Sequence, residues 1–466
     1  MSRRTIAWAA TSTRLVVGAA VSVGLVLVTG VAVAAPWPGR EAQPVSIAVT
    51  PRPSDTVLAC TGSLLAAGRN VERAADLTAA AAQAVVSGSA SAALEPEKLT
   101  AQPAFGDAGL VLTAAPDGDR PADAAAAGSA AVNADDLRGF AASACRPPLI
   151  ESWLVAGATT TGSADLVLLS NPGDVPATVQ LTFYGVKGAS VPTGGRDLVV
   201  AARTQRVVPL AGLATGEGAP VVRVTSSGAP ITAALQSSLT RVLLTGGVDQ
   251  TGATAASANS VVVPGVVVPQ SAVDAAAAGA TTIARLLSPG VDAQATVTAT
   301  AADGTQTFRQ VVPLVADEPV EVDLSGLAAG AYTVRAQSQT PIVGAVWQTT
   351  GFGQNADFAW HSAAPDVSDD TLVAVPGGPS PTLSVTTSAA SATVTLEPVS
   401  GAPASAVTAT VTAGRTASVA LVAGAVYRLR ADAPVNAAVT YSGDGALAAF
   451  PVWPADTASA ALTVYP

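Results

Sequence analysis

Histidine and cysteine are scarce in this chain of 466 residues, which has one histidine, His361, and two cysteines. Multi-histidine metal sites and zinc ribbons are therefore excluded, and a histidine-based triad would have to use His361. We interpret His361 as a surface or interdomain residue. Charged residues make up 12% of the chain and aromatic residues 4%, and the net charge is −10. That charge argues against binding nucleic acid through its phosphates, and we expect no cofactor.

Hydrophobic residues are abundant, at 49% of the chain. Intrinsic disorder is therefore not expected, because disordered chains combine low hydrophobicity with high net charge. At roughly 100 to 200 residues per domain, this length predicts two to four domains.

Residues 15–35 form an uncharged apolar run. At about 1.5 Å per residue, a helix of this length matches a hydrocarbon core about 30 Å thick. Three arginines precede the run, and the first acid of the chain is Glu41. The positive-inside rule then predicts a single-pass protein of the cell membrane, with residues 1–14 as a cytoplasmic tail and the rest extracytoplasmic.

A cleavable signal peptide is the alternative for the same segment. Ala32-Val33-Ala34 has the small-x-small form that signal peptidase reads, and cleavage there would give a secreted protein. Arg3-Arg4 also weakly resembles a twin-arginine export signal. All of these interpretations export the rest of the chain.

Both cysteines, Cys60 and Cys145, follow the apolar run. Disulfides persist in an exported compartment, so we expect these two to pair. Such a loop closure would remove roughly 4 to 5 kcal/mol of unfolded-state entropy. The pair defines a first β-domain over residues 36–148, in which the alanine-rich stretches 74–86 and 123–132 are weakly patterned. For residues 74–86, a short helix and a low-complexity connection both remain open.

From Cys145 onward, short runs rich in Val, Thr, Leu and Ala alternate with turn residues, which predicts an all-β fold. Residues 295–301 and 320–324 show the apolar-polar alternation of half-buried strands.

Three segments, residues 222–236, 332–347 and 427–440, share one pattern that predicts a hairpin. In each, a strand runs into a polar turn, and a proline begins the returning strand, where the missing N–H costs least.

Further landmarks keep the same order, so we expect three tandem immunoglobulin-like β-sandwich domains after one N-terminal transmembrane helix. Their boundaries are 149–258, 259–365 and 366–466. Each should have its own core, as in a stalk of tandem domains. A propeller is rejected because its blades repeat at roughly 40 to 50 residues.

Three segments carry a resemblance to a known family: ESWLVAG at 151–157, LLSNPGDVPA at 168–177, and Tyr184-Gly185. With the N-terminal anchor, they resemble the actinobacterial family known as large secreted proteins, a domain family of unknown function. The resemblance implies an exported, β-rich envelope protein and brings no catalytic residues.

Paired carboxylates are the remaining catalytic possibility, and the candidates are Asp317, Glu318, Glu321 and Asp323. Because Glu321 and Asp323 alternate with valines, we interpret them as a solvated strand face. We expect no metal site and no enzyme activity.

Four tryptophans are candidate platforms for stacking sugars: Trp153, Trp347, Trp360 and Trp453. Trp360 and Trp453 recur at the same place in successive repeats, which favours a core or a seam between domains. We favour the same interpretation for the other two.

These observations favour a non-catalytic, membrane-anchored scaffold or interaction stalk of the cell envelope. Its partners would be the membrane, through residues 15–35, and envelope proteins or glycans. A protein that binds envelope polysaccharide is the alternative function.

Overall fold

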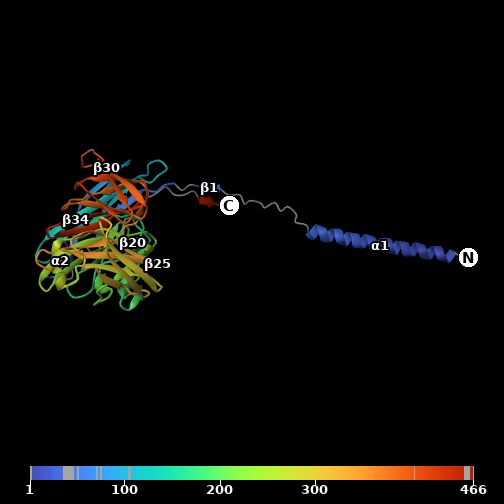
Figure 1. The fold of residues 1–466 in the computed structure, drawn as a ribbon, viewed down its shortest axis with the longest axis horizontal. Coiled ribbons are helices and arrows are strands. Elements are labelled where there is room, and N and C mark those ends of the chain that lie inside the picture. Colours follow the sequence, from blue (N-terminus) through green and yellow to red (C-terminus); the bar gives the residue numbers. More distant parts are fainter. Residues whose placement is uncertain are drawn as a thin grey trace. The chain divides into compact units, whose positions relative to one another are not determined.

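The computed structural model describes residues 3–34, 47–49, 52–69, 72–73, 76–102, 106–254, 256–403, 405–455 and 462–464. It divides into two units (Figure 1), one of Met1–Pro51 with Ser459–Pro466 and one of Arg52–Ala458. The first unit contains helix α1 (Arg3–Ala34), and its stretch Thr13–Ala34 is long and apolar enough to cross a membrane. Strand β1 (Ile47–Val49) pairs antiparallel with β36 (Leu462–Val464) in the same unit.

The second unit is all-β, as predicted, and its described strands form four modules. Module 1 contains β2 (Thr56–Ala59), β3 (Leu64–Ala67), β4 (Leu77–Ala81), β5 (Ala84–Ser89), β6 (Glu95–Lys98), β7 (Thr100–Gln102), β8 (Leu110–Ala114), β9 (Ala124–Asn133) and β10 (Arg138–Ala144). Module 2 contains β11 (Glu151–Leu154), β12 (Leu166–Asn171), β13 (Ala177–Gly185), β14 (Gly188–Ser190), η1 (Thr193–Gly195), β15 (Leu198–Val200), β16 (Thr204–Pro209), η2 (Leu210–Gly212), β17 (Val221–Ser227), β18 (Thr232–Arg241) and β19 (Leu244–Gly252).

The other two modules complete this unit (Figure 1). Module 3 contains β20 (Ala258–Val268), α2 (Gln270–Ala275), η3 (Ala276–Ala278), β21 (Thr282–Leu287), β22 (Ala293–Ala301), β23 (Gln306–Leu314), β24 (Val320–Asp323), β25 (Gly330–Thr349) and β26 (Phe358–Ser362). Module 4 contains β27 (Asp366–Val367), β28 (Thr371–Ala374), β29 (Thr382–Thr387), β30 (Ser391–Ser400), β31 (Val407–Thr412), β32 (Thr416–Ala420), β33 (Val426–Ala431), β34 (Val435–Gly443) and β35 (Ala446–Pro451).

Every module repeats the same pairing of strands in two sheets. The sheet that holds each module's first long strand has the order β2-β8-β6, β11-β17-β13, β20-β25-β22 and β28-β33-β30. The other sheet has the order β10-β9-β5, β19-β18-β12, β26-β25-β21 and β35-β34-β29. Module 1 therefore has the topology of the three others, with the hairpin β3-β4 inserted, although its sequence predicted only a different, fourth β-domain.

The three predicted hairpins are wrong, because the two strands of each lie in different sheets. β17 and β18 do not pair with each other, and neither do β33 and β34. In module 3, β25 is one 20-residue strand. Before Pro341 it pairs with β22 and with all of the paired residues of β20 except Ala258, whose partner is Ile342; from Val343 onward it pairs with β21 and β26. The shared proline marks the point where the chain passes from one sheet to the other. At this point its missing N–H removes no hydrogen bond from either sheet.

The alanine-rich stretches of module 1 are strands rather than a helix or surface loops. Their described part comprises β4 and β5 in the first stretch and β9 in the second. Ala126 and Ala127 of β9 are buried, and β28 of module 4 packs against β9 and β5. Alanine has a weak propensity for strands, but its methyl side chain lets the two sheets approach closely. Tight packing therefore favours alanine in these strands.

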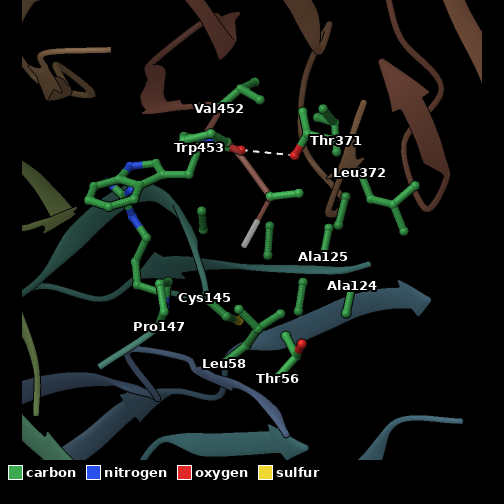
Figure 2. A pocket seen from close by; sticks show the side chains of 18 of the residues that line it. Thr56, Leu58, Ala124, Ala125, Cys145, Pro147, Thr371, Leu372, Val452 and Trp453 are labelled. Carbon is green, nitrogen blue, oxygen red and sulfur yellow. Dashed lines mark hydrogen bonds between the residues drawn. The ribbon is translucent and has the colours of Figure 1, made fainter. Parts of the chain in front are cut away.

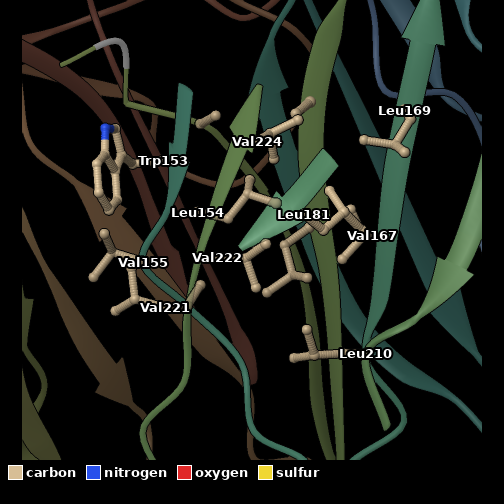
Figure 3. Close-up of a cluster of buried hydrophobic side chains, with 14 of the residues drawn as sticks. Trp153, Leu154, Val155, Val167, Leu169, Leu181, Leu210, Val221, Val222 and Val224 are labelled. Atoms are coloured by element: carbon tan, nitrogen blue, oxygen red, sulfur yellow. The ribbon is translucent and has the colours of Figure 1, made fainter. Parts of the chain in front are cut away.

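The apolar-polar alternation predicted for β22 and β24 is present. Ala295, Val297 and Ala299 are buried, and so are Val322 and Leu324. Figure 3 shows the corresponding core of module 2, where Val167 and Leu169 of β12 face Leu181 of β13 and Val222 and Val224 of β17. The core of each sandwich thus lies between its two sheets.

The four modules close into a ring through their last strands. β10 contacts β19 and β35, and β26 also contacts β19 and β35. β20 of module 3 packs on β29 and β34 of module 4, and β28 of module 4 packs on β5 and β9 of module 1. Such head-to-tail contacts close when the rotation between copies completes a circle. The repeats of Arg52–Ala458 therefore contact one another in a ring instead of following one another as a stalk, although each repeat is a sandwich and not a propeller blade.

Asp357 lies where the four last strands meet, and its carboxylate is fully buried. Oδ2 accepts hydrogen bonds from the backbone N–H of Phe140 in module 1 (2.9 Å) and of Leu447 in module 4 (3.1 Å). Oδ1 accepts one from the N–H of Val248 in module 2 (3.2 Å). Burial raises the pKa of this carboxyl group well above its usual range. One side chain of module 3 therefore holds the three other modules.

The disulfide between Cys60 and Cys145 is present, with the two Cα atoms 4.1 Å apart. It joins the residue after β2 to the residue after β10. Because these strands belong to the two different sheets of module 1, the bond ties the sandwich together at one end.

Candidate functional site

A cavity that combines polar and aromatic side chains lies at the seam between modules 2 and 3. Its volume is about 190 Å³, and it is lined by Gly157, Ala158, Thr160, Ser163, Asp165, Gly218, Ser237, Ser238, Leu239, Ile283, Arg285, Glu321, Trp347, Phe358 and Trp360. Concave sites that combine aromatic walls with a few converging polar groups are the usual location of ligand binding. This seam is our candidate functional site.

Arg285 of β21 is the central cation of this cavity, and its side chain is only 2% exposed. Nη1 donates to the carbonyl oxygens of Gly157 (2.7 Å) and Pro220 (2.9 Å) of module 2. Nη2 donates to the carbonyl oxygen of Gly218 (3.0 Å) and to Oε1 of Glu321 (2.8 Å). The guanidinium is therefore fully engaged in joining the two modules, which is the arrangement that a buried charge requires.

Asp165 is the buried acid on the module 2 side of the cavity. Oδ2 accepts from the N–H of Ala158 (2.7 Å), and Oδ1 accepts from the N–H of Ser238 (2.9 Å). Burial raises the pKa of Asp165 to about 6, against the opposing effect of these hydrogen bonds and of the Arg285 charge. Both carboxylate oxygens of Asp165 accept hydrogen bonds from backbone N–H groups, so this side chain has a structural role.

Two of the four tryptophans line this cavity. Trp360 is 4% exposed, and the guanidinium carbon of Arg285 lies 4.5 Å from the centre of its ring. Trp347 pairs with Trp360 across β25 and β26 and is half-buried, so part of its surface faces the cavity. Trp360 is thus a seam residue, and Trp347 is the aromatic group with room for a ligand.

Trp153 and Trp453 lie elsewhere in the ring. Trp153 is 3% exposed in the core of module 2 (Figure 3), with the ring of Tyr184 at 5.4 Å. Trp453 lies at the seam between modules 4 and 1, where it covers the guanidinium of Arg146 at 3.7 Å. The fold does not bring the four tryptophans together in one platform.

The four candidate acids are dispersed by the structure. Asp317 accepts from the N–H of Gly290 (2.8 Å), Asp323 accepts from the N–H of Ser325 (2.8 Å), and Glu318 is half-buried. Glu321 is exposed, as predicted for the solvated strand face, and it also pairs with Arg285 at the seam. Among the residues that the structure describes, no group of three or more His, Cys, Asp and Glu side chains could hold a metal ion.

His361 is buried at 4% exposure in β26, which contacts modules 2 and 4 through β19 and β35. Burial lowers its pKa to about 4. It is not among the residues that line the candidate cavity.

Sequence reasoning missed Arg285, Asp165 and Arg146 as site residues. A signal was available in retrospect, since Arg285 is the only charged residue between Asp274 and Asp292 and stands in an apolar strand. A lone charge in a buried strand predicts a partner in another part of the fold, but it does not say which one.

Comparisons with known proteins give one result. No curated protein and no solved structure matches the chain. A family model described as a family of unknown function, DUF5719, matches residues 100–422. The match begins within module 1 and ends within module 4, and it covers more than half of the sequence. The chain therefore belongs to the family of unknown function DUF5719.

Proposed function

We propose that this protein is a non-catalytic, extracytoplasmic platform of the cell envelope, held at the membrane by α1. The observation that carries the proposal is the closed ring, in which the charged and aromatic groups that catalysis would need serve the seams instead. Arg285 and Asp357 bind backbone groups of other modules, and Trp360 lies against Arg285. Such a ring supplies a rigid surface for partners, and the function then lies in that surface rather than in the fold.

In this proposal, the arginines that precede the apolar run of α1 determine the membrane topology and place residues 1–14 in the cytoplasm. Protease added to intact cells should digest the β modules while leaving the N-terminal tail protected. Determination of the mature N-terminus separates the anchor from a signal peptide. A protein that starts after Ala34 is secreted, and a tail digested from outside contradicts the orientation.

The non-catalytic part of the proposal is tested with envelope polysaccharides as substrates. We expect no hydrolysis by the full-length protein in detergent. Hydrolysis that is lost in both D165N and E321Q, with D292N unchanged as the control, would show that the seam acids act as a catalytic pair.

Binding of an envelope polysaccharide is the second candidate function, and the half-buried Trp347 favours it. This ring shares its cavity with the hydroxyl groups of Thr160 and Ser163 and with the carboxylate of Asp165. An aromatic face with neighbouring polar groups suits a sugar ring, which presents C–H groups and hydroxyls together. Isothermal titration of glycans should give saturable heat that W347A abolishes and that the exposed-loop variant V242A retains. Equal binding by W347A contradicts this candidate.

A further inference from the structure

A second cavity lies at the seam between modules 4 and 1, and it contains a buried cation without an anion. Arg146 is 6% exposed and lines this cavity. Among the described residues, no acid forms an ion pair with Arg146, and its Nη1 has no hydrogen-bond partner. Arg285, which is also buried, has four acceptors at the seam between modules 2 and 3. A buried charge without a partner is costly, so a ligand that supplies the anion would stabilise it.

The backbone holds Arg146 in a fixed place. Cys145, which forms the disulfide, precedes it, and Arg146 exchanges two backbone hydrogen bonds with Ala59 (2.8 and 2.9 Å). Trp453 lies over the guanidinium, with its ring centre 3.7 Å from Cζ. A cation whose backbone is fixed and whose guanidinium is stacked on a ring loses little freedom when it binds an anion, which favours affinity.

The walls of the cavity are apolar (Figure 2). They include Leu58, Ala124, Ala125, Leu372 and Val452. The cavity volume is about 80 Å³, and one water needs about 10–15 Å³ by this kind of measure, so there is room for one small ligand.

The two hydroxyl groups that line the cavity do not offer hydrogens to a ligand. Thr56 Oγ1 donates to the carbonyl oxygen of Ala122 (2.7 Å), and Thr371 Oγ1 donates to the carbonyl oxygen of Trp453 (2.9 Å; Figure 2). Arg146 is then the one cation among the described lining residues. A phosphate carries more charge and needs several donors, whereas one guanidinium matches a single carboxylate with two parallel N–H donors.

We propose that this cavity binds a small aliphatic carboxylate, with its carboxylate on Arg146 and its alkyl group against the alanine and leucine side chains. The site is independent of the candidate cavity between modules 2 and 3, and no covalent step is involved.

Isothermal titration of the full-length protein in detergent with propionate tests this site. We expect saturable binding of one propionate per chain and at least a tenfold loss of affinity in R146Q. The matched control is R309Q, which removes an exposed arginine of β23 and should bind propionate unchanged. Propionamide and inorganic phosphate should not bind. Absence of saturable heat, equal affinity in R146Q, or binding of propionamide or phosphate as strong as that of propionate would overturn the proposal.

A second measurement covers the case in which R146Q does not fold. Trp453 Nε1 is buried and has no hydrogen-bond partner, so its indole N–H signal reports on the cavity. Propionate should shift the indole signal that is missing from the W453F spectrum, and R146K, which keeps the charge but lacks the planar fork, should bind propionate more weakly than the wild type. An unshifted signal at saturating propionate overturns the assignment of the site.

Discussion

Replacing Asp357 by alanine is expected to loosen all four modules together, because this side chain accepts hydrogen bonds from the three other modules. The variant leaves the N–H groups of Phe140, Val248 and Leu447 buried without that acceptor. Each such orphaned donor costs about 1–3 kcal/mol, which gives about 3–9 kcal/mol for three. The variant also no longer buries a carboxyl group whose pKa is raised by desolvation, and this gain offsets part of the loss. We therefore expect the free energy of unfolding to fall by about 3–5 kcal/mol.

Hydrogen exchange read by mass spectrometry on the full-length protein is the decisive assay. Peptides from β10, β19 and β35, in modules 1, 2 and 4, should all exchange faster in D357A. The control is D292A, because Asp292 is exposed and accepts one bond from the N–H of Ala316 (2.8 Å), so its loss should cost at most about 1 kcal/mol. Faster exchange confined to the loop around residue 357, or stability equal to that of D292A, would refute the role of Asp357 as the joint of the ring.

A glycine next to this joint gives an independent perturbation. Gly247 has φ +121°, and a Cβ built there would lie 2.6 Å from Oδ1 of Asp357. We expect G247A to destabilise the same three strands, through backbone strain and through displacement of the carboxylate. If G247A leaves exchange in β10 and β35 unchanged, the close approach at this position is not needed for closure.

Three further predictions concern the disulfide, the seam cation and pH. Replacing Cys60 and Cys145 by serine should lower the free energy of unfolding by about 4–5 kcal/mol on the chain-entropy model, since 85 residues separate them. If chemical denaturation gives the same free energy of unfolding for the oxidised wild type and for the variant, this prediction is contradicted. R285A should cost about 3–5 kcal/mol and open the seam between modules 2 and 3 to hydrogen exchange, whereas an unchanged midpoint would show that the buried pair is not needed. Asp249 of β19 is fully buried, and its Oδ2 accepts a hydrogen bond from the N–H of Trp360 (2.7 Å). Burial raises its pKa to about 7, so its contribution to stability is fully present below about pH 4 and is lost, by up to about 4 kcal/mol, as the pH rises to about 7. Burial lowers the pKa of His361 to about 4, so its contribution is present above about pH 6.5 and is lost as the pH falls toward 4. Asp165 and Asp357 also have raised pKa values and contribute to the first dependence. Urea titrations at several pH values should therefore show a smaller first dependence in D249N than in the wild type and an unchanged second one, and a D249N profile identical to that of the wild type would contradict the assignment.

Local features of the sequence determined the strands with clear alternation, the disulfide and the apolar helix. Alternation in residues 295–301 reports which face is buried, because a strand places successive side chains on opposite sides. The pairing of Cys60 with Cys145 follows because the chain has two cysteines and both lie in the part that is predicted to be exported. The recurring proline predicted three copies of one unit, but it could not distinguish a hairpin from a crossing between sheets, because both place proline where a ladder begins.

Only the tertiary structure decided the fourth copy, the ring and its seams. Module 1 has the shared topology, yet its alanine-rich strands carry no repeated residues that sequence comparison could detect, because methyl groups suit a tightly packed sheet without a distinctive pattern. The partners of Asp357 are backbone N–H groups from three distant segments, and a backbone group leaves no mark in the sequence. Arg146 and Arg285 are likewise both single arginines in apolar surroundings. Long-range packing alone gave Arg285 four acceptors and placed Arg146 against the ring of Trp453 beside a cavity.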